Sequence, residues 1–211
     1  MSAPTPTPIW KIGGMSGPLR LTFLQSASRA DQLPPSPAEV AFVGRSNVGK
    51  SSLVNALANR KQLARVSNTP GRTQLINLFE VASARSEPGT MVDLPGYGFA
   101  KAAKNVKRDW PEMIEGYLLG RENLSMVFVL VDGVIGPTRL DAQMLDWLRY
   151  NGVPHTVVAT KFDKVKSSKR ATRKKELAAG CQLDQGDIVW ASASKGDGID
   201  ALRSLVRTWV G

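Results

Sequence analysis

The sequence predicts an α/β fold with three layers, in which helices cover both faces of a mostly parallel mixed sheet. Three observations support this prediction. Strand-like and helix-like stretches alternate along the chain, as they do in strand–helix–strand units. Several strand-like stretches are continuous apolar runs, such as MVFVLVD at 126–132, which is typical of strands buried on both faces. A glycine-rich turn, GRSNVGKS at 44–51, joins one of these strands to a helix.

The predicted elements alternate with one exception. Strand-like runs lie at 40–43, 75–81, 90–94, 126–132, 155–160 and 187–192, and helix-like stretches lie at 50–63, 106–119, 138–150, 167–179 and 198–209. Only the short stretch ASARSEPG separates 75–81 from 90–94, so we expect these two strands to be antiparallel neighbours. Ligands of such sheets bind at the carboxyl ends of the strands, so functional motifs are expected directly after strands.

The length of 211 residues is sufficient for one sizeable core. Residues 1–20 are rich in Pro, Thr, Ser and Gly and predict a flexible tail, residues 21–37 a segment that leads into the domain, and residues 38–211 the domain itself. The single cysteine, Cys181, excludes an intramolecular disulfide. No apolar run approaches the roughly 20 residues of a membrane span, and the N-terminus shows no secretory signal. We therefore expect a cytoplasmic protein, and a monomer.

The stretch GRSNVGKS matches the phosphate-binding pattern G-x-x-x-x-G-K-[ST]. Its glycines let the backbone wrap so that N–H groups point at phosphate oxygens, and the following helix adds its N-terminal amides. We expect Lys50 to pair with the β- and γ-phosphates and the Ser51 hydroxyl to ligate Mg²⁺. The predicted nucleotide contacts in this loop are Gly44, Arg45, Ser46, Asn47, Val48, Gly49, Lys50, Ser51 and Ser52, the last near the α-phosphate.

The motif DLPG follows the strand-like run at 90–92. Asp93 lies where a phosphate-loop enzyme places its second Mg²⁺-orienting carboxylate, and the Gly96 N–H is in a position to reach the γ-phosphate. The motif alone is weak because Asp and Gly are common turn residues. After a phosphate loop and a strand it becomes more specific.

The motif TKFD, after another apolar strand, indicates which base is bound. The carboxylate of Asp163 can accept two hydrogen bonds from the ring N1 and exocyclic N2 of guanine, a pair of donors that adenine lacks. The aliphatic stem of Lys161 could cover the base. After the last strand, WASAS supplies Ser192 and Ala193, whose backbone could reach the guanine oxygen. The order of these motifs predicts a GTPase.

The stretches GRSNVGKSSLVNAL, SNTPGRTQLINLFEV, DLPGYGFAKA and TKFDKV resemble the EngB-type GTPases of the TrmE–Era–EngA–EngB–septin-like class. The resemblance runs from about residue 20 to the end and is most specific in TPGRTQ followed by DLPGYG. It implies a P-loop GTPase domain that binds GTP, GDP and Mg²⁺. It also implies a role in assembly of the large ribosomal subunit and a requirement for normal cell division and septation.

The resemblance also assigns site residues by their place in the matched motifs. Thr73 would complete the Mg²⁺ shell beside Ser51, and Lys50, Thr73 and Gly96 would act in catalysis on an attacking water. The remaining implied contacts are Gly71, Arg72, Gln74 and Leu75 beside the γ-phosphate, Asp93, Leu94 and Pro95 in the second motif, and Thr160, Lys161, Asp163, Ala191, Ser192 and Ala193 around the base.

Three positions bear on how GTP is hydrolysed. Thr160 stands where Asn is usual in GTPases, as in the EngB-type family itself, so guanine specificity is still expected. Tyr97 follows DLPG where many GTPases have a glutamine that orients water, so hydrolysis is expected to be slow in the isolated protein. Related GTPases with Asn at the position of Asn47 can hold a K⁺ ion against the phosphates, so the resemblance suggests a K⁺ ion here that would neutralise transition-state charge. The alternative is that Asn47 is only a turn residue.

The chain has 28 Lys and Arg against 18 Asp and Glu, a formal net charge of +10. This excess favours a polyanionic partner, nucleic acid rather than an anionic membrane, although it could serve only solubility. The basic residues expected to contact ribosomal RNA are Lys101, Lys104, Lys107, Arg108, Lys166, Lys169, Arg170, Arg173 and Lys174. Those after 164 recur at helical spacing and could form one stripe for RNA phosphates, or a solvated helix face.

Two other functions stay open from the sequence. The first is a nucleotide-gated RNA-binding module whose hydrolysis is incidental. The second is a septum-associated scaffold that uses GTP to assemble, although no heptad repeat offers an assembly element.

Overall fold

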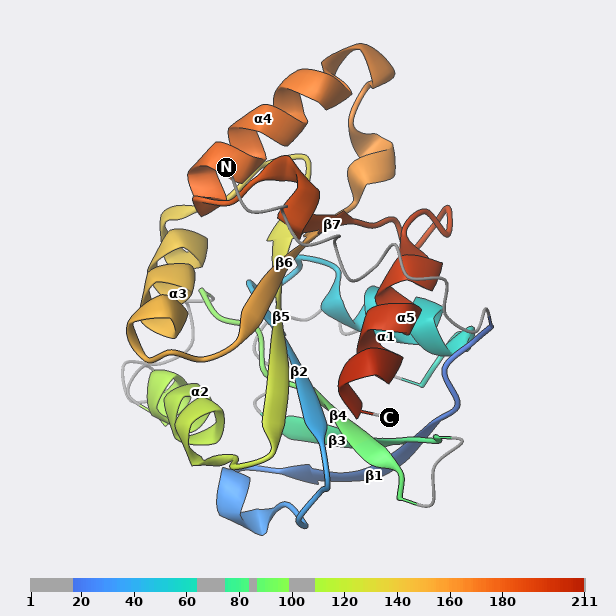
Figure 1. The fold of residues 1–211 in the computed structure, drawn as a ribbon, viewed down its shortest axis with the longest axis vertical. Coiled ribbons are helices and arrows are strands. Elements are labelled where there is room, and N and C mark those ends of the chain that lie inside the picture. The colour runs from blue at the N-terminus through green and yellow to red at the C-terminus, as the bar shows by residue number, and fades with distance from the viewer. Residues whose placement is uncertain (1–16, 64–74, 84–86, 99–108, 211) are drawn as a thin grey trace, which may run out of the picture.

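The computed structural model describes residues 17–63, 75–83, 87–98 and 109–210, and within these it shows one seven-stranded sheet with helices on both faces (Figure 1). The strands are β1 (Leu21–Ala27), β2 (Glu39–Gly44), β3 (Ile76–Val81), β4 (Gly89–Asp93), β5 (Leu124–Asp132), β6 (His155–Thr160) and β7 (Ile188–Trp190). The helices are α1 (Lys50–Ala58), α2 (Asp109–Gly120), α3 (Arg139–Tyr150), α4 (Arg170–Cys181) and α5 (Ile199–Val210). The predicted three-layer α/β/α architecture is confirmed.

The strand order is β1-β3-β4-β2-β5-β6-β7, with β2 at the centre. β2 runs parallel to β4 and β5, and parallel pairing continues through β6 to β7. β3 pairs antiparallel with both β4 and β1. The prediction that the stretches 75–81 and 90–94 are antiparallel neighbours is therefore confirmed, and the sheet is mixed but mostly parallel.

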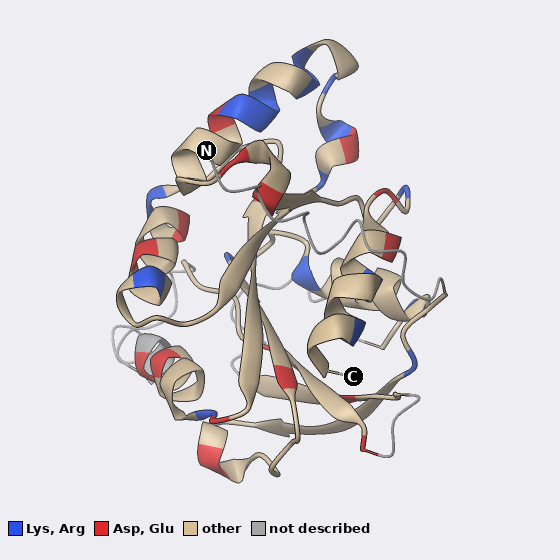
Figure 2. Ribbon diagram, in the orientation of Figure 1, with Lys and Arg blue, Asp and Glu red and all other residues tan. Residues whose placement is uncertain are grey.

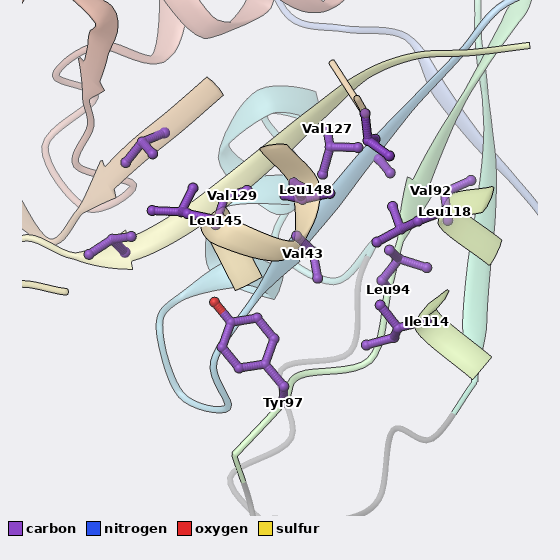
Figure 3. Close-up of a cluster of buried hydrophobic side chains, with 14 of the residues drawn as sticks. Val43, Val92, Leu94, Tyr97, Ile114, Leu118, Val127, Val129, Leu145 and Leu148 are labelled. Atoms are coloured by element: carbon purple, nitrogen blue, oxygen red, sulfur yellow. The ribbon is translucent and has the colours of Figure 1, made fainter. Parts of the chain in front are cut away.

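The central strand β2 shows why the sheet needs a helical layer on each face, because every residue in it is buried. Ala41 and Val43 belong to the core cluster that includes side chains of α2, α3 and α4 (Figure 3). Val40 and Phe42 belong to the cluster on the other face, with side chains of α1 and α5. The helices on each face bury apolar surface of the sheet, and each Å² buried contributes about 25 cal/mol to the free energy of folding. Both helical layers therefore stabilise the domain.

β1 is not among the predicted strands, because it lies inside the segment 21–37 that is predicted only to lead into the domain. This strand is at the edge of the sheet. Most residues between its two buried ends are exposed, among them Phe23 at 48% and Leu24 at 42%. Its register with β3 also shifts between Phe23 and Gln25. An edge strand with a bulge lacks the continuous apolar run that identified the other strands.

Helix boundaries differ from the predicted ones by a few residues. α1 ends at Ala58 rather than at residue 63, because Asn59 adopts a left-handed conformation with φ of 51° that closes the helix. α4 begins at Arg170, after a short 3-10 turn over Ser167–Lys169. The predicted helix 106–119 is described from Asp109 onwards as α2, and its first residues lie outside the described part of the chain.

The amino and carboxyl ends of the parallel strands carry different polar groups. At the amino end of β2, the carboxylate of Glu39 is fully buried and accepts hydrogen bonds from Tyr117 Oη at 2.6 Å, Thr90 Oγ1 at 2.7 Å and Arg121 Nε at 2.8 Å. These partners satisfy the buried charge and tie α2 to the sheet. The loops that follow the carboxyl ends of β2, β4, β5 and β6 include those that carry the predicted motifs.

Candidate functional site

The glycine-rich loop lies between the carboxyl end of β2 and the first turn of α1, as predicted. Its last residue before the helix, Gly49, has a φ of 102°, and Asn47 has a φ of 65°, both in the left-handed region. At Gly44 an added Cβ would lie 2.9 Å from the Cβ of Leu130 on β5, so a larger residue would displace the loop. The sequence therefore has Gly or Asn where the backbone requires them.

Lys50 and Asp93 meet between the glycine-rich loop and the end of β4. The Lys50 ammonium donates a hydrogen bond to the Asp93 carboxylate, which is 3% exposed. β2 and β4 are in parallel register, with Phe42 opposite Asp93, so the fold itself brings the two motifs together. This contact places the lysine of the first motif beside the carboxylate of the second.

The segment after Asp93 runs directly against the glycine-rich loop. The Ser46 N–H donates to the Tyr97 carbonyl at 2.9 Å, and the Tyr97 N–H donates to the Gly44 carbonyl at 3.1 Å. Ser46 Oγ donates to the Gly96 carbonyl at 3.3 Å. An added Cβ at Gly96 would lie 3.0 Å from the Ser46 Cα, so glycine permits this close approach.

The side chain of Tyr97 is turned into the core rather than toward the loops. It is 3% exposed and lies among apolar side chains such as Ile114 and Leu145 (Figure 3). Its hydroxyl donates to Asp141 Oδ1 at 2.7 Å, and Asp141 Oδ2 accepts from the Thr138 N–H at 2.8 Å at the start of α3. Burial, followed by the Asp141 carboxylate, raises the pKa of Tyr97 well above its ordinary value, so this phenol stays protonated.

The loop after β6 is tied to the glycine-rich loop by two side chains. Thr160 Oγ1 donates to the Val48 carbonyl at 2.6 Å, and Lys161 Nζ donates to the Asn47 carbonyl at 2.7 Å. Thr160 thus makes a direct hydrogen bond to the loop from the position where Asn is usual. The three motifs, distant in sequence, therefore form one connected set of loops.

Asp163 lies beside the segment that follows β7. Ser194 Oγ donates to Asp163 Oδ2 at 3.1 Å. Partial burial would raise the pKa of Asp163, but hydrogen bonds from Ser192 and Ser194 outweigh it and hold the pKa below its ordinary value. The Ala191 N–H donates to the Ala159 carbonyl at 2.8 Å, which aligns this segment with β6. The carboxylate is therefore ionised at neutral pH and is held by the segment predicted to lie near it.

Several predicted site residues cannot be placed in this arrangement. Gly71, Arg72, Thr73 and Gln74, and the basic residues Lys101, Lys104, Lys107 and Arg108, lie outside the described residues. Leu75 is described, directly before β3, and is 42% exposed. The remaining predicted residues of the loops lie at the carboxyl edge of the sheet.

Two buried carboxylates with contacts to these loops were absent from the sequence prediction. Asp132 ends β5, is 4% exposed and accepts a hydrogen bond from Lys161 Nζ at 2.8 Å. Asp141 is 2% exposed and receives the Tyr97 hydroxyl. Asp132 follows an apolar strand just as Asp93 does, so the same rule could have identified it. Asp141 gave a local signal only for the start of a helix, through the capping box that it forms with Thr138, because its partner Tyr97 is 44 residues away.

The described residues offer no cluster of three or more His, Cys, Asp or Glu side chains for a metal ion. No helix in the part of the chain that the structure covers is long and apolar enough to cross a membrane.

The fold and the order of its loops define the class of P-loop GTPases. Residues 39–161 match a family model described as "50S ribosome-binding GTPase". The probable GTP-binding protein EngB of Pelotomaculum thermopropionicum is 46% identical over 191 residues, which cover 90% of this chain and 94% of that relative. EngB of Geobacter sulfurreducens is 46% identical over 85% of this chain and 86% of its own length. The chain belongs to the EngB family of GTP-binding proteins and is a GTP-hydrolysing enzyme.

Solved structures agree with this assignment. A crystal structure of a probable GTP-binding protein EngB superposes with a TM-score of 0.61 at 25% identity, over 80% of this chain and 96% of that one. A variant of Aquifex aeolicus Era, bound to GDP and AlF4⁻, superposes with a TM-score of 0.66 at 24% identity, over 83% of this chain and 57% of that one. The second likeness concerns the fold alone.

Proposed function

We propose that the guanine nucleotide lies across the connected loops at the carboxyl edge of the sheet. The phosphates would contact the backbone of 44–52 and the ammonium of Lys50, and the base would contact Asp163 and the backbone of 191–193. The observation that carries this proposal is the set of hydrogen bonds joining Thr160 and Lys161 to the phosphate loop, since these bonds fix the base-reading loop relative to the phosphate-binding one. An ionised Asp163 suits the two adjacent donors of guanine.

The oxygen-bearing side chains beside the phosphate loop fit Mg²⁺. The ion prefers hard oxygen ligands and is usually held by one or two protein groups together with substrate phosphates. The Ser51 hydroxyl in the first turn of α1 would be one ligand, the buried carboxylate of Asp93 would orient the shell, and Thr73, outside the described residues, would complete it. When bound, Mg²⁺ would neutralise charge on the β- and γ-phosphate oxygens.

The isolated protein is proposed to hydrolyse GTP slowly. The Gly96 N–H would stabilise the γ-phosphate, but the next side chain, Tyr97, is buried in the core and bonded to Asp141. A buried phenol with a raised pKa neither reaches nor deprotonates an attacking water. The catalytic effect would therefore come from Lys50, Thr73 and the backbone amides.

A K⁺ ion beside Asn47 is a further proposal for how hydrolysis is accelerated. The Asn47 side chain is exposed, and its carbonyl accepts from Lys161. Its left-handed φ of 65° is also what a simple turn residue would show, so the structure is compatible with both explanations. Turnover compared in K⁺ and Na⁺ at equal ionic strength separates them, because equal rates would exclude the K⁺ role.

We infer a biological role in assembly of the large ribosomal subunit in the cytoplasm, with an associated requirement for normal cell division and septation. The family model is described as 50S ribosome-binding, and the net charge of +10 suits an RNA partner. Figure 2 shows basic residues along α4, which lies next to the loop that carries Asp163.

The basic side chains of α4 differ in their surroundings. Arg170 and Lys174 lie over the ring of Phe162 at 5.3 and 5.4 Å, and Arg173 pairs with Glu176 at 3.2 Å. Lys166 and Lys169 are exposed and precede the helix, which begins at Arg170. The exposed pair is therefore the best candidate for direct contact with RNA phosphates, whereas Arg170 and Lys174 also hold α4 against the base-reading loop.

Co-sedimentation with large ribosomal subunits, at physiological K⁺ and Mg²⁺, tests this role. Binding with a non-hydrolysable GTP analogue but not with GDP would support a GTP-gated assembly factor, because loss of the γ-phosphate would release the segments held at Thr73 and Gly96. Equal binding in both states would exclude the gating. Binding with negligible turnover would favour the RNA-binding module, and GTP-dependent filaments without subunit binding would favour the scaffold.

A further inference from the structure

Asp132 is the last residue of β5 and lies beside Lys161 at the carboxyl ends of the parallel strands. Its Oδ1 atom accepts hydrogen bonds from the backbone N–H groups of Val134 at 2.9 Å and Ile135 at 3.2 Å, which close the turn after the strand. Its Oδ2 atom accepts from Lys161 Nζ at 2.8 Å. The carboxylate is 4% exposed, so it depends on these partners for the solvation that it has lost.

The direction of the pKa shift agrees with that geometry. Burial alone would raise the pKa of the Asp132 carboxyl, but the hydrogen bonds from Lys161, Val134 and Ile135 outweigh burial and lower it. The group is therefore an anion that faces the ammonium of Lys161.

Lys161 crosses the phosphate loop between two oxygen atoms. Its ammonium is shared between Asp132 Oδ2 and the Asn47 carbonyl, at 2.8 and 2.7 Å. Its Cε lies 3.6 Å from the point that a Cβ on Gly49 would occupy, so the stem passes along the loop. The backbone of Lys161 is left-handed, with φ of 56°, which turns the chain sharply after β6. Among the described residues, the Asn47 carbonyl alone would hold the ammonium without Asp132.

The sheet fixes Asp132 relative to Lys161. Asp132 pairs in parallel register with Thr160, the residue before Lys161. The Gly133 N–H donates to the Thr160 carbonyl at 2.8 Å, and an added Cβ at Gly133 would lie 2.6 Å from that carbonyl oxygen. The carboxylate is thus placed by two strands rather than by a loop, which gives it a rigid position.

We propose that Asp132 is a positioning residue for nucleotide binding, which holds the Lys161 side chain across the phosphate loop so that its stem covers the guanine base. The inference rests on the proposed function, in which Lys161 takes that place. Because Lys161 would contact the base and not the γ-phosphate, Asp132 affects GDP and GTP alike. Loss of the carboxylate releases the ammonium and speeds nucleotide dissociation, with little effect on the chemical step.

The test compares Asp132→Asn with Glu39→Gln. Glu39 is an equally buried carboxylate in an ion pair, at the opposite edge of the sheet, and takes no part in the loops. Dissociation of fluorescent GDP and of a fluorescent non-hydrolysable GTP analogue is measured, together with the thermal midpoint without nucleotide. D132N is expected to accelerate release of both nucleotides by about tenfold or more, whereas E39Q lowers the midpoint and leaves the release rates unchanged.

A double-mutant cycle shows whether Asp132 acts through Lys161. Lys161→Met removes the ammonium, and in that background D132N should accelerate release no further. D132E, which keeps the charge but displaces it by one methylene, provides a second variant if D132N does not fold. Wild-type release rates in D132N or D132E, equal acceleration by E39Q, or additive effects in the cycle would overturn the inference.

Asp163→Asn separates this inference from the proposed site. If D163N still binds GDP like the wild type, the proposed site itself is wrong. If D163N no longer binds GDP while D132N releases GDP at the wild-type rate, the proposed nucleotide site is supported and only the role proposed for Asp132 is wrong.

Discussion

The hydroxyl of Tyr97 donates a hydrogen bond of 2.7 Å to Asp141 and joins the DLPGYG segment to the first turn of α3. Both residues are almost fully buried. Tyr97→Phe should lower the free energy of unfolding by about 1–3 kcal/mol, because a buried carboxylate loses a donor. Since the phenol faces the core, single-turnover GTP hydrolysis should stay within about twofold of wild type. Urea unfolding and a quenched hydrolysis assay check both, and a large loss of hydrolysis would mean that the hydroxyl acts in catalysis.

Gly96→Ala tests the close contact between the DLPG segment and the phosphate loop. A Cβ there would lie 3.0 Å from the Ser46 Cα, so the segment must move and the Gly96 N–H with it. Hydrolysis should fall about tenfold or more, as when one transition-state donor is lost. GDP affinity should change little, because this amide is proposed to contact only the γ-phosphate.

Gly116→Ala is the matched control for that change. Gly116 lies in α2, and an added Cβ would meet no described atom within 4 Å apart from the backbone of its own helix. This variant should keep the wild-type rate and gain up to about 1 kcal/mol of stability from better helix propensity. A G96A enzyme as active as G116A would contradict the proposed role of the Gly96 amide.

The pH dependence of GDP affinity tests the state of Asp163. Hydrogen bonds from Ser192 and Ser194 outweigh partial burial and hold the pKa of this carboxyl below its ordinary value. The ionised form that guanine requires therefore persists as pH falls, and is lost only below the ordinary Asp pKa of about 4. Calorimetric titration should show no loss of GDP affinity attributable to this group between about pH 8 and pH 5. A loss centred near pH 6, absent in D163N, would contradict this.

The exposed lysines before α4 should contribute to binding of the large ribosomal subunit. Replacing Lys166 and Lys169 together by Gln should weaken binding and reduce the slope of log affinity against log salt by about one per lysine. Arg60 and Lys61, exposed after α1 on the other face of the sheet, provide the control pair. Equal effects of both double variants would indicate a non-specific response to net charge.

Local motifs made much of this molecule predictable from the sequence. The glycine-rich loop, Asp93 and Asp163 each follow an apolar strand, and the parallel sheet brings such positions to one edge. The antiparallel β3–β4 pair followed from the short connection between its strands. These features depend on residues close together in sequence, which is why pattern and spacing sufficed.

Features that depend on distant contacts were not predictable in the same way. β1 has an exposed face and a bulge, so it lacked an apolar run. The burial of Tyr97 depends on Asp141 in another element, and the role proposed for Asp132 depends on Lys161, 29 residues further on. Thr160 was recognised as a departure from the usual Asn, but only the structure shows its hydrogen bond to Val48.

Direct titration of nucleotides into the nucleotide-free protein tests the central claim, that these loops form the guanine nucleotide site. Wild type should bind GDP and reject ADP and xanthosine diphosphate. D163N should lose GDP and gain xanthosine diphosphate, since an amide can donate to the additional oxygen of xanthine. Unchanged GDP binding by D163N, or equal affinity of the wild type for GDP and ADP, would contradict the account.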